Sequence, residues 1–408
     1  MTAPNLFLLV SLVGAAFTIS ALVQARRLAA FSMPYFMGAW LTGELPLHHL
    51  AWQAAATLIF GAFGAFESAA GLFGLAVTFA SWAGLLAIHG KAIGARAATR
   101  EALAENGLTP EEDVSPWHGL RPFRMKRPGV EALRGREYGP PLPGDKGGRN
   151  KLDVVRPREP GTRRPALLQV HGGGWVIGEK EQQGQPLMHH MAEQGWVCFA
   201  PNYRLSPKAT FPDHIVDVKR ALVWIREHAE EFGIDPDFIA VTGGSAGGHL
   251  AALMALSQND PMFQPGFEEG DTRISAAVPF YGVFDFLDRH GIRGSQSMTP
   301  FLAKNVLKCS PEENRELWDA ASPLSRVSTD APPFLVIQGT HDSLVFVEEA
   351  RVFVEALREK SQNSVLYLEL DGAQHAFETF HSVRSAHAIR AATAFLQDVH
   401  RRHLELTS

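Results

Sequence analysis

A glycine-rich stretch, residues 243–248, constrains the fold of this chain more than any other part of its sequence. It reads Gly-Gly-Ser-Ala-Gly-Gly and follows residues 238–242, a short apolar and mostly β-branched run that is typical of a buried parallel strand. Residues 249–255, which come next, are rich in helix formers. Ser245 is therefore expected in a sharp, strained turn between a strand and a helix, which only small neighbouring residues permit.

Such a turn holds the Ser245 hydroxyl at the end of a sheet and above a helix N-terminus. The free N–H groups at a helix N-terminus favour negative charge, which suits a nucleophile. The alternative is a glycine-rich turn of an ordinary α/β domain, including one that holds phosphate, because a lone G-x-S-x-G pattern also occurs by chance. The other motifs of the chain decide between these interpretations.

Strands and helices alternate from residue 166 onward. Apolar runs that predict strands occupy residues 166–170, 196–200, 238–242, 276–281, 334–338 and 365–370. Helical periodicity separates them, for example over residues 213–232. This alternation predicts an α/β fold with a doubly wound, mostly parallel sheet and with its active groups at the C-terminal ends of the strands.

A second glycine run, His171-Gly172-Gly173-Gly174, follows the first of these strands. Glycines expose backbone N–H groups, so Gly173 and Gly174 together with the N–H of Ala246 could hold an oxyanion. A phosphate-binding turn is the alternative, although the run lacks the ending of a P-loop and the spacing of a dinucleotide fingerprint. His171 precedes the glycines, and we expect it to be a structural hydrogen bonder rather than a base.

Two further polar residues each follow a late strand. Asp342 lies on the loop after residues 334–338, where a carboxylate can fix the tautomer of an imidazole or can simply cap the helix that starts near Leu344. His375 lies on the loop after residues 365–370, although it is one of 17 histidines. The order Ser, Asp, His, with each residue just after a strand, is the order found in α/β-hydrolases.

Together with Tyr203-Arg-Leu-Ser-Pro207, these motifs resemble the hormone-sensitive-lipase family of α/β-hydrolase esterases over about residues 151–403. The resemblance implies Ser245 as nucleophile, His375 as base and Asp342 as its partner. It also implies an oxyanion hole formed by Gly173, Gly174 and Ala246, with no metal and no cofactor. Gly244 departs from the family pattern, because many relatives carry an acidic residue before the serine.

The first ninety or so residues are nearly uncharged. Residues 6–25 are long enough for a membrane helix and precede Arg26-Arg27. A cleaved signal peptide is the alternative, but no basic region comes before the apolar run.

Residues 50–88 contain a single charge, Glu67, and suit two antiparallel spans that turn near residues 64–71. The alternatives are one long helix or a pair that dips into one leaflet. The aromatics and prolines of residues 33–49 predict an interfacial segment. The pair His48-His49 lacks further metal-ligand spacing.

The basic residues that flank the apolar blocks place the catalytic part on the cytoplasmic side of a bacterial-type inner membrane, if there are three spans. Residues 121–164 have an excess of basic over acidic side chains, which indicates either contact with anionic headgroups or a solvated linker that folds over the domain.

The predicted organisation is a membrane region over residues 1–95, a basic linker or cap segment over 96–150, and a catalytic domain over 151–408. An apolar insertion over residues 284–323 is expected to cap the site. The membrane-attached N-terminus resembles that of arylacetamide deacetylases and certain bacterial membrane esterases.

The formal net charge of −5 gives no case for nucleic acid, and two cysteines cannot make a disulfide framework. The sequence thus predicts a membrane-attached serine carboxylesterase or lipase that hydrolyses lipophilic esters through an acyl-enzyme. An amidase or deacetylase and an acyltransferase would use the same residues, and an inactive membrane scaffold is the alternative from another class. The expected partners are a lipophilic ester and the lipid bilayer. An oligomer is possible, and the sequence does not set its size.

Overall fold

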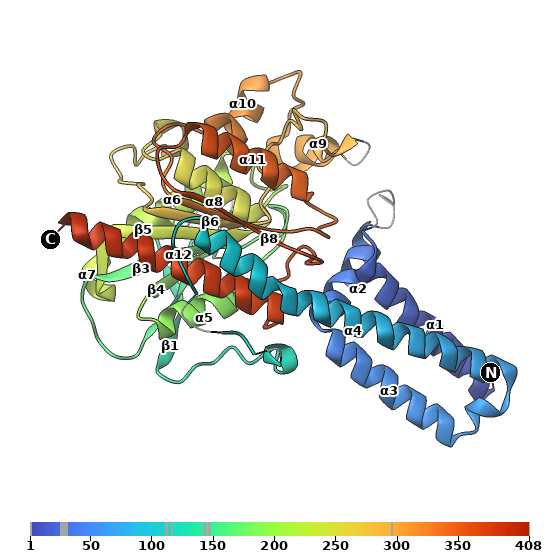
Figure 1. The fold of residues 1–408 in the computed structure, drawn as a ribbon. Coiled ribbons are helices and arrows are strands. Elements are labelled where there is room, and N and C mark those ends of the chain that lie inside the picture. Colours follow the sequence, from blue (N-terminus) through green and yellow to red (C-terminus); the bar gives the residue numbers. More distant parts are fainter. Residues whose placement is uncertain are drawn as a thin grey trace.

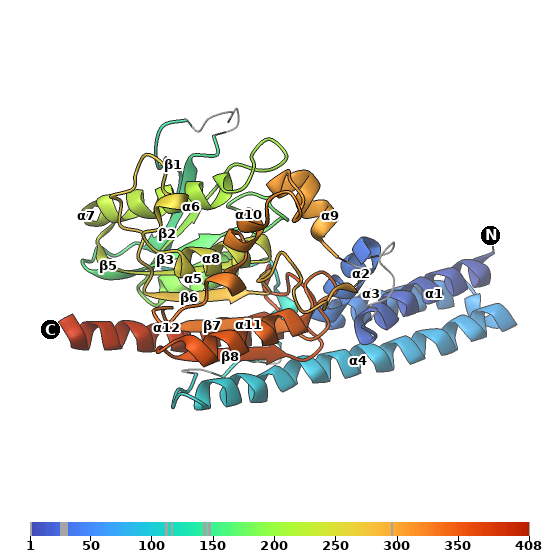
Figure 2. The same cartoon turned by 90° about the horizontal axis from the view of Figure 1, so that it is seen from above.

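A computed structural model of the chain describes residues 2–24, 32–110, 113–115, 117–141, 145, 148–294 and 297–407. Within these residues the chain forms an α/β domain and a bundle of apolar helices that projects from one end of it (Figure 1). The N-terminus lies at the far end of the bundle, and the C-terminus lies at the opposite end of the molecule (Figure 2). The α/β class predicted from the alternation of strands and helices is confirmed.

An eight-stranded sheet within the described residues forms the centre of the α/β domain. In chain order its strands are β1 (Val130–Glu137), β2 (Lys151–Pro157), β3 (Arg164–Val170), β4 (Val197–Pro201), β5 (Ile234–Gly244), β6 (Ala276–Phe280), β7 (Phe334–Gly339) and β8 (Val365–Leu370). Their spatial order is β1-β2-β4-β3-β5-β6-β7-β8. Strand β2 runs antiparallel to β1 and β4, whereas all pairs from β4 to β8 are parallel. The C-terminal ends of the parallel strands therefore share one edge of the sheet, where doubly wound proteins bind their ligands.

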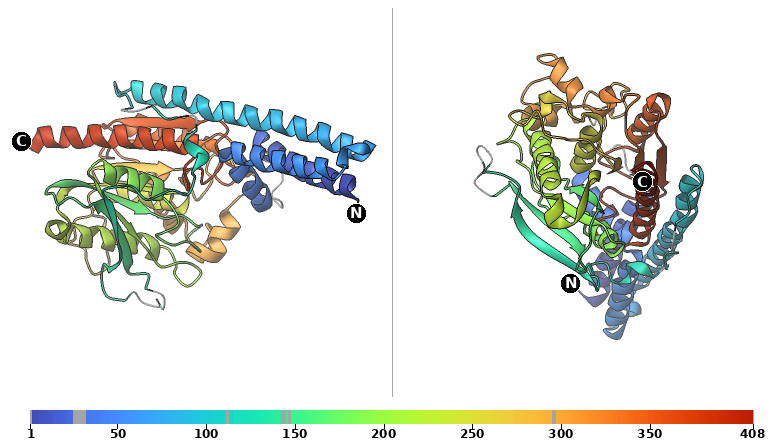
Figure 3. Two further views of the ribbon diagram at one scale, coloured as in Figure 1. Left: turned by 90° about the horizontal axis from the view of Figure 1, so that it is seen from below. Right: turned by 90° about the vertical axis from the view of Figure 1, so that its left-hand side faces the viewer.

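Helices cover both faces of the sheet (Figures 1 and 3). One face carries α6 (Asp213–Glu227), α7 (Ala229–Phe232), α8 (Ala246–Leu256) and α11 (Val347–Lys360). The other carries α5 (Gln185–Glu193), α12 (Val383–Thr407) and the last turns of α4 (Ala69–Ala104). Consecutive strand residues point to opposite faces, so Leu167 packs in one core and Leu168 in the other. Burial on both faces explains why the central strands are mostly apolar.

The bundle comprises α1 (Ala3–Leu22), α2 (Ser32–Glu44), α3 (Pro46–Ala62), the short η2 (Ala65–Glu67) and α4. Among the described residues, α1 and α4 are the helices long and apolar enough to cross a membrane. The second apolar block forms two antiparallel helices, because α3 ends at Ala62 and α4 begins at Ala69. The region expected at the interface, residues 33–49, contains α2 and the start of α3. Arg26 and Arg27, with the end of the first expected span, lie outside the described residues.

Helices α1 and α4 pack closely through small and hydroxyl-bearing residues. A Cβ at Gly74 would lie 3.1 Å from the Cα of Leu8, so the two backbones approach where no side chain intervenes. Thr18 and Ser81 share a hydrogen bond of 2.7 Å between their hydroxyls. Close backbone approach and hydroxyl hydrogen bonds between helices are typical of packing in a lipid environment.

The boundaries expected at residues 95 and 150 stay predictions, and two elements of the structure bear on them. Helix α4 continues past residue 95 to Ala104 and packs beside α12, so one helix belongs to both parts (Figure 3). Strand β1 lies inside the segment 96–150 and pairs with β2 as the edge of the sheet. The sequence expectation missed β1 because its residues alternate with charged and exposed positions, as an edge strand allows.

The insertion over residues 284–323 folds into short helices beside the sheet edge. They are α9 (Thr299–Phe301), the π-helical η6 (Leu302–Leu307) and α10 (Arg315–Ala320). Trp318 of α10 is fully buried and packs against Phe286 at a ring-centroid distance of 6.4 Å. The insertion therefore has its own apolar anchor in the core of the domain. The remaining short turns are η3 (His118–Leu120), η4 (Pro261–Phe263) and η7 (Pro323–Arg326).

Candidate active site

Ser245 lies in a strained turn between β5 and α8. Its φ of 60° and ψ of −122° are rare for a residue with a side chain. The turn is held by its N–H, which donates to the Phe280 carbonyl at 3.0 Å. A Cβ at Gly247 would lie 2.1 Å from the Val170 carbonyl oxygen, so only glycine fits there. Ser245 is partly exposed, whereas its neighbours in the turn are buried.

The glycine run after β3 lies directly against this turn. A Cβ at Gly172 would lie 3.2 Å from the Cβ of Ser245. The N–H of Gly172 donates to Gln183 Oε1 at 2.6 Å, so this amide is already occupied. Gly173 and Gly174 follow with φ values of 114° and 59°, which favour glycine. Their backbone can thus approach a substrate beside Ser245 without an intervening side chain.

His171 is held inside the domain by hydrogen bonds and stacking. Its Nδ1 donates to the Gly172 carbonyl at 2.8 Å, and its ring stacks on Tyr203 at a centroid distance of 4.3 Å. Burial lowers the pKa of His171 to about 4, so the ring is neutral near pH 7. These contacts fit the structural role expected of His171.

Asp342 and His375 meet at the same edge of the sheet. Asp342 Oδ2 accepts a hydrogen bond from His375 Nδ1 at 2.7 Å. Because Nδ1 carries the proton, the Nε2 of the neutral ring is left as the acceptor. Asp342 does not cap α11, which begins at Val347. Its Oδ1 instead accepts from the N–H groups of Leu344 and Val345, at 2.9 and 2.8 Å, and so fixes the loop.

Two glutamines that sequence reasoning missed support this pair. Gln338, the penultimate residue of β7, donates from Nε2 to Asp342 Oδ2 at 3.2 Å. Gln374 accepts from the N–H of Ser343 at 2.7 Å and from the N–H of His375 at 2.9 Å. Gln374 thereby ties the Asp342 loop to the His375 loop. A polar residue at the end of a buried strand, such as Gln338, was the available signal.

Tyr281, directly after β6, connects His375 with the serine turn. The centroid of its ring lies 4.5 Å from the centroid of the His375 ring, and its hydroxyl donates to the Glu378 carboxylate. A Cβ at Gly244 would lie 2.6 Å from the Tyr281 hydroxyl oxygen. The loops after four neighbouring parallel strands thus bring Ser245, Tyr281, Asp342 and His375 to one edge. The same contact explains the glycine at position 244, since an acidic side chain there would collide with Tyr281.

Burial raises the pKa of the Glu378 carboxyl above its ordinary value of 4.5, and raises that of the Tyr281 hydroxyl well above 10. Both side chains are enclosed between the His375 loop and the sheet. The pair therefore forms a polar contact in an apolar environment, beside the imidazole. The sequence offered only a weak signal for it, a glutamate three residues after His375.

The helical bundle contacts the loops that carry Asp342 and His375. Phe36 of α2 meets the His375 ring edge-on at a centroid distance of 6.1 Å, and Trp40 Nε1 donates to the Ala376 carbonyl at 2.9 Å. Gln24, which follows α1, donates from Nε2 to the Thr340 carbonyl on the Asp342 loop at 2.6 Å. His341 points toward α1, where its Nδ1 lies 3.3 Å from the Ala21 carbonyl, and not toward His375. Sequence reasoning assigned none of these bundle residues to the site.

The cap contributes an apolar side chain beside the glycine run. A Cβ at Gly174 would lie 3.7 Å from the Cζ of Phe301. Phe301 is 37% exposed at the end of α9, so its ring faces the glycine run from the cap. Helices α2 and α9 thus approach the site from different parts of the chain (Figure 2).

The described residues include no group of three His, Cys, Asp or Glu side chains arranged to hold a metal ion. Cys198 is buried, Cys309 is partly exposed, and both are free thiols. At the edge of the sheet that carries Ser245, the described residues supply a hydroxyl, an imidazole, a carboxylate and backbone amides.

Comparison with known proteins places the fold in a family. The family description BD-FAE matches residues 152–357, which is half of the chain. The chain belongs to the BD-FAE family. The matched residues of this BD-FAE chain include Ser245 and Asp342 and end before His375.

The chain is also similar to individual proteins that are named as ester hydrolases or deacetylases. The probable carboxylic ester hydrolase LipM of Mycobacterium tuberculosis is 51% identical over 260 residues, which is 63% of this chain and 60% of LipM. Rabbit (Oryctolagus cuniculus) arylacetamide deacetylase is 38% identical over 105 residues, or 25% of this chain and 26% of the relative. The solved structure of Thermogutta terrifontis esterase 2 phosphonylated by sarin matches with a TM-score of 0.55 and 27% identity, covering 67% of this chain and 96% of that one.

These matches confirm the resemblance to α/β-hydrolase esterases of the hormone-sensitive-lipase type. The chain spans about three fifths of the length of LipM.

Proposed function

We propose that this chain is a membrane-attached serine carboxylesterase that hydrolyses lipophilic carboxylic esters. The hydrogen bond of 2.7 Å between Asp342 and His375 carries the proposal, because it leaves Nε2 of His375 as a base at the edge that holds Ser245. The similarity to LipM, a probable carboxylic ester hydrolase, supports the reaction class.

In the first step, His375 Nε2 takes the proton of the Ser245 hydroxyl as its oxygen attacks the ester carbonyl carbon. The carbonyl π pair moves to oxygen and forms an oxyanion. The N–H groups of Gly173, Gly174 and Ala246 are the proposed donors to this oxyanion. Asp342 stabilises the imidazolium that results.

The oxyanion then collapses, the bond to the alkoxy group breaks, and the imidazolium protonates the leaving alcohol. In the second step, His375 takes a proton from water, whose oxygen attacks the acyl-enzyme. Collapse of the second tetrahedral intermediate releases the acid and restores the Ser245 hydroxyl. Protons balance over the cycle, so the residues of this chain suffice for the reaction.

Replacement of the nucleophile tests this mechanism. Ser245→Ala should retain substrate binding and lose about four to six orders of magnitude in kcat on p-nitrophenyl butyrate. A fluorophosphonate probe should label the parent protein and not the variant. Hydrolysis by the variant at near the parental rate would refute the role of Ser245. Absence of labelling in the folded parent protein would favour an inactive scaffold.

Membrane attachment is supported by the two helices long and apolar enough to span a bilayer, α1 and α4, and by the apolar α3 beside them. Three spans with Met1 outside would place the catalytic domain at the cytoplasmic face, as the positive-inside rule favours. Alkaline carbonate should leave the full-length protein in the membrane pellet. Cysteine-accessibility labelling at exposed sites on both sides of the bundle checks the orientation.

The contacts between the bundle and the His375 loop favour a lipophilic substrate. On α2, Met33 and Met37 are 56% and 43% exposed and flank the buried Phe36. Apolar side chains of α2 and of the cap thus border the site where a membrane-dissolved ester would approach it. A chain-length series of p-nitrophenyl esters should show kcat/KM rising from acetate toward longer acyl chains. Equal values along the series would contradict a lipophilic preference.

An amidase or deacetylase is the second candidate, because one relative is an arylacetamide deacetylase. The same nucleophile, base and oxyanion donors would serve an amide. The ratio of rates on a matched aryl ester and anilide separates the two functions, and product analysis with added alcohol reveals acyl transfer.

A further inference from the structure

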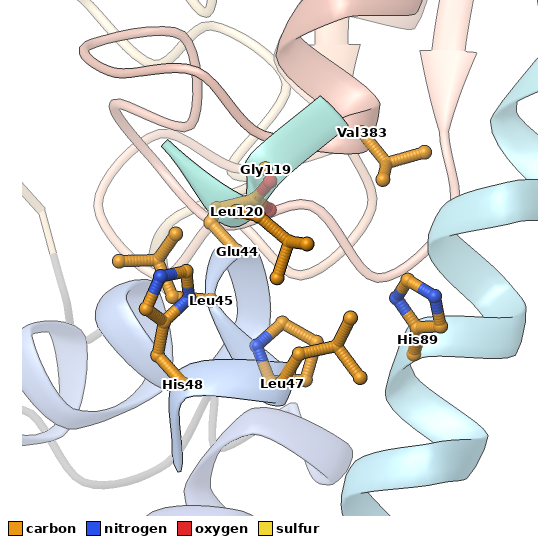
Figure 4. Close-up of a pocket in the computed structure, with 9 residues that line it drawn as sticks. Glu44, Leu45, Leu47, His48, His89, Gly119, Leu120 and Val383 are labelled. Carbon is orange, nitrogen blue, oxygen red and sulfur yellow. The ribbon is translucent and has the colours of Figure 1, made fainter. Parts of the chain in front are cut away.

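A segment of the predicted basic region lies at the level where the bundle meets the α/β domain. The ring of Trp117 is 6.3 Å from the ring of His89, in the last uncharged turn of α4 before Lys91. Gly119 and Leu120 of η3 line a small cavity with residues of the α2–α3 turn and with His89 (Figure 4). If α4 spans the bilayer, residues 117–120 therefore lie near the membrane–water boundary, and residues 121–127 follow them directly in the chain.

This segment forms a concave surface lined almost entirely by basic side chains. A cavity of about 230 Å³ lies between it and the start of α12. Its lining consists of Pro128 and of six basic side chains, those of His118, Arg121, Arg124, Lys126, Arg127 and His381. No carboxylate lines the cavity among the described residues. A site with this charge would attract an anion.

The cations of this cavity are not neutralised by the described part of the chain. Arg121, Arg124 and Lys126 form no ion pair there, and Arg127 has only Glu193, at 3.9 Å. His381 is 95% buried, and its Nε2 has no hydrogen-bond partner among the described residues. Burial, His118 and Arg127 lower the pKa of His381 to about 4. A buried polar atom beside unpaired cations favours an anionic ligand whose oxygens can accept hydrogen bonds from these groups.

Exposed apolar side chains lie in the same segment. Trp117, Leu120 and Phe123 are 62%, 52% and 71% exposed. Aromatic residues next to arginine and lysine are typical of the headgroup region, where the ring enters the lipid and the cation meets phosphate. The apolar residues thus indicate that the anion belongs to a lipid rather than to the aqueous phase.

We propose that the cavity lined by Arg121, Arg124, Lys126, Arg127, His118 and His381 binds the phosphate of an anionic phospholipid headgroup from the surrounding bilayer. The guanidinium groups would donate to the phosphate oxygens, and the exposed aromatics would pack on the acyl chains. This site rests on the membrane attachment proposed above, but not on the catalytic mechanism. It is separate from Ser245 and takes a lipid as ligand rather than as substrate.

The test measures lipid binding to the full-length protein in detergent. Dihexanoyl phosphatidylglycerol, dihexanoyl phosphatidylcholine and inorganic phosphate are each titrated, and bound lipid is followed by native mass spectrometry and by the melting temperature. The variant Arg121→Ala/Arg124→Ala/Lys126→Ala removes three cations of the cavity. The control Arg136→Ala/Lys360→Ala/Arg402→Ala removes three exposed cations elsewhere and has the same net charge.

We expect phosphatidylglycerol to bind the parent and the control equally. The cavity variant should bind it on the order of a hundredfold more weakly, since each basic residue near an anionic lipid contributes about a factor of five. Equal binding of phosphatidylcholine and phosphatidylglycerol would overturn the site, as would equal losses in both variants. Inorganic phosphate that competes at equal concentration would overturn its assignment to lipid. Hydrolysis of p-nitrophenyl butyrate by all three proteins separates this result from failure of the catalytic proposal.

Discussion

Phe36, in an apolar helix near the start of the chain, meets the ring of His375 edge-on at a centroid distance of 6.1 Å. The two residues belong to different parts of the molecule, and their contact joins the helical bundle to the base of the proposed triad. Phe36 is 8% exposed and His375 is 5% exposed, so the contact excludes water from one side of the imidazole. Helix α2 is therefore expected to influence catalysis directly.

Removal of this contact should slow hydrolysis without abolishing it. In Phe36→Ala the imidazole keeps Asp342 but loses its apolar neighbour, so we expect kcat/KM on p-nitrophenyl butyrate to fall about tenfold, mainly through kcat. Phe36→Leu should restore part of the loss. The control is Phe63→Ala, at a bundle residue that is 74% exposed. If both alanine variants match the parent, the contact has no role in the reaction.

The pair formed by Tyr281 and Glu378 should be sensitive to loss of the hydroxyl. Tyr281→Phe leaves the buried Glu378 without its donor, which we expect to cost about 1–3 kcal/mol of unfolding free energy. Glu378→Gln keeps an acceptor for the hydroxyl and should cost less. Thermal unfolding in detergent measures both. A Tyr281→Phe variant as stable as the parent would show that Glu378 finds another partner.

The pKa of Glu378 is raised by burial, and this has a defined consequence for pH dependence. Above the ordinary value of 4.5 the unfolded chain releases this proton before the folded chain does. Glu378 therefore stabilises the fold fully below that pH, and the contribution is lost as the pH rises through the folded pKa. Compared with the parent, Glu378→Gln should lose less stability as the pH rises above 4.5. A parallel pair of curves would contradict the shift.

The sequence predicted the residues of the candidate site better than their surroundings. Ser245, Asp342 and His375 each follow a mostly apolar strand, and parallel strands place such residues at one edge. Tyr281 and Phe36 could not be found in this way. Their contacts with His375 depend on how loops and helices pack in three dimensions, and an isolated aromatic residue in a sequence carries no information about its partner.

The sequence also could not show that one helix continues past the limit expected at residue 95. Helix α4 changes from uncharged to charged near Lys91, which looks like a boundary in the sequence, although the helix continues to Ala104 without a break. Its apolar stripe simply passes from the partners in the bundle to those on α12, because Leu85 packs on α1 and Leu103 packs in the core of the α/β domain. The charge content of a helix follows the environment that surrounds it. Where the helix ends depends instead on its backbone hydrogen bonds and their caps.

Buried neutral histidines should make the α/β domain sensitive to acid. Burial lowers the pKa of His249 to about 4, and the ring accepts from Trp175 Nε1 at 3.2 Å and donates to the Ala321 carbonyl at 2.8 Å. Between pH 6.5 and 4 the unfolded chain binds a proton at this residue and the folded chain does not, so stability falls on acidification, by about 3 kcal/mol for a shift of this size.

The variant His249→Gln keeps an acceptor and a donor but cannot be protonated. It should melt below the parent at pH 7, and its melting temperature should fall less between pH 6.5 and 4.5. His290→Gln, at an exposed histidine, is the control and should follow the parent. Equal acid sensitivity of His249→Gln and the parent would assign the effect to other groups.

The bundle and the α/β domain should unfold together because a buried ion pair joins them. Arg384 of α12 lies 3.3 Å from Glu44 of α2, donates to the Gly43 carbonyl at 2.9 Å, and is 1% exposed. Glu44 also accepts from the Ser382 hydroxyl at 2.6 Å.

In Glu44→Ala the Arg384 guanidinium stays buried without its counter-charge, which should cost about 3–5 kcal/mol of unfolding free energy. Lys91→Ala breaks the exposed pair with Asp371 between the same two parts, so it should cost less than about 1 kcal/mol. Thermal unfolding of full-length protein, followed by circular dichroism and by proteolysis of the His375 loop, measures both variants. If Glu44→Ala melts with the parent, or if it loosens the bundle while the His375 loop stays protected, then this ion pair does not couple the unfolding of the two parts.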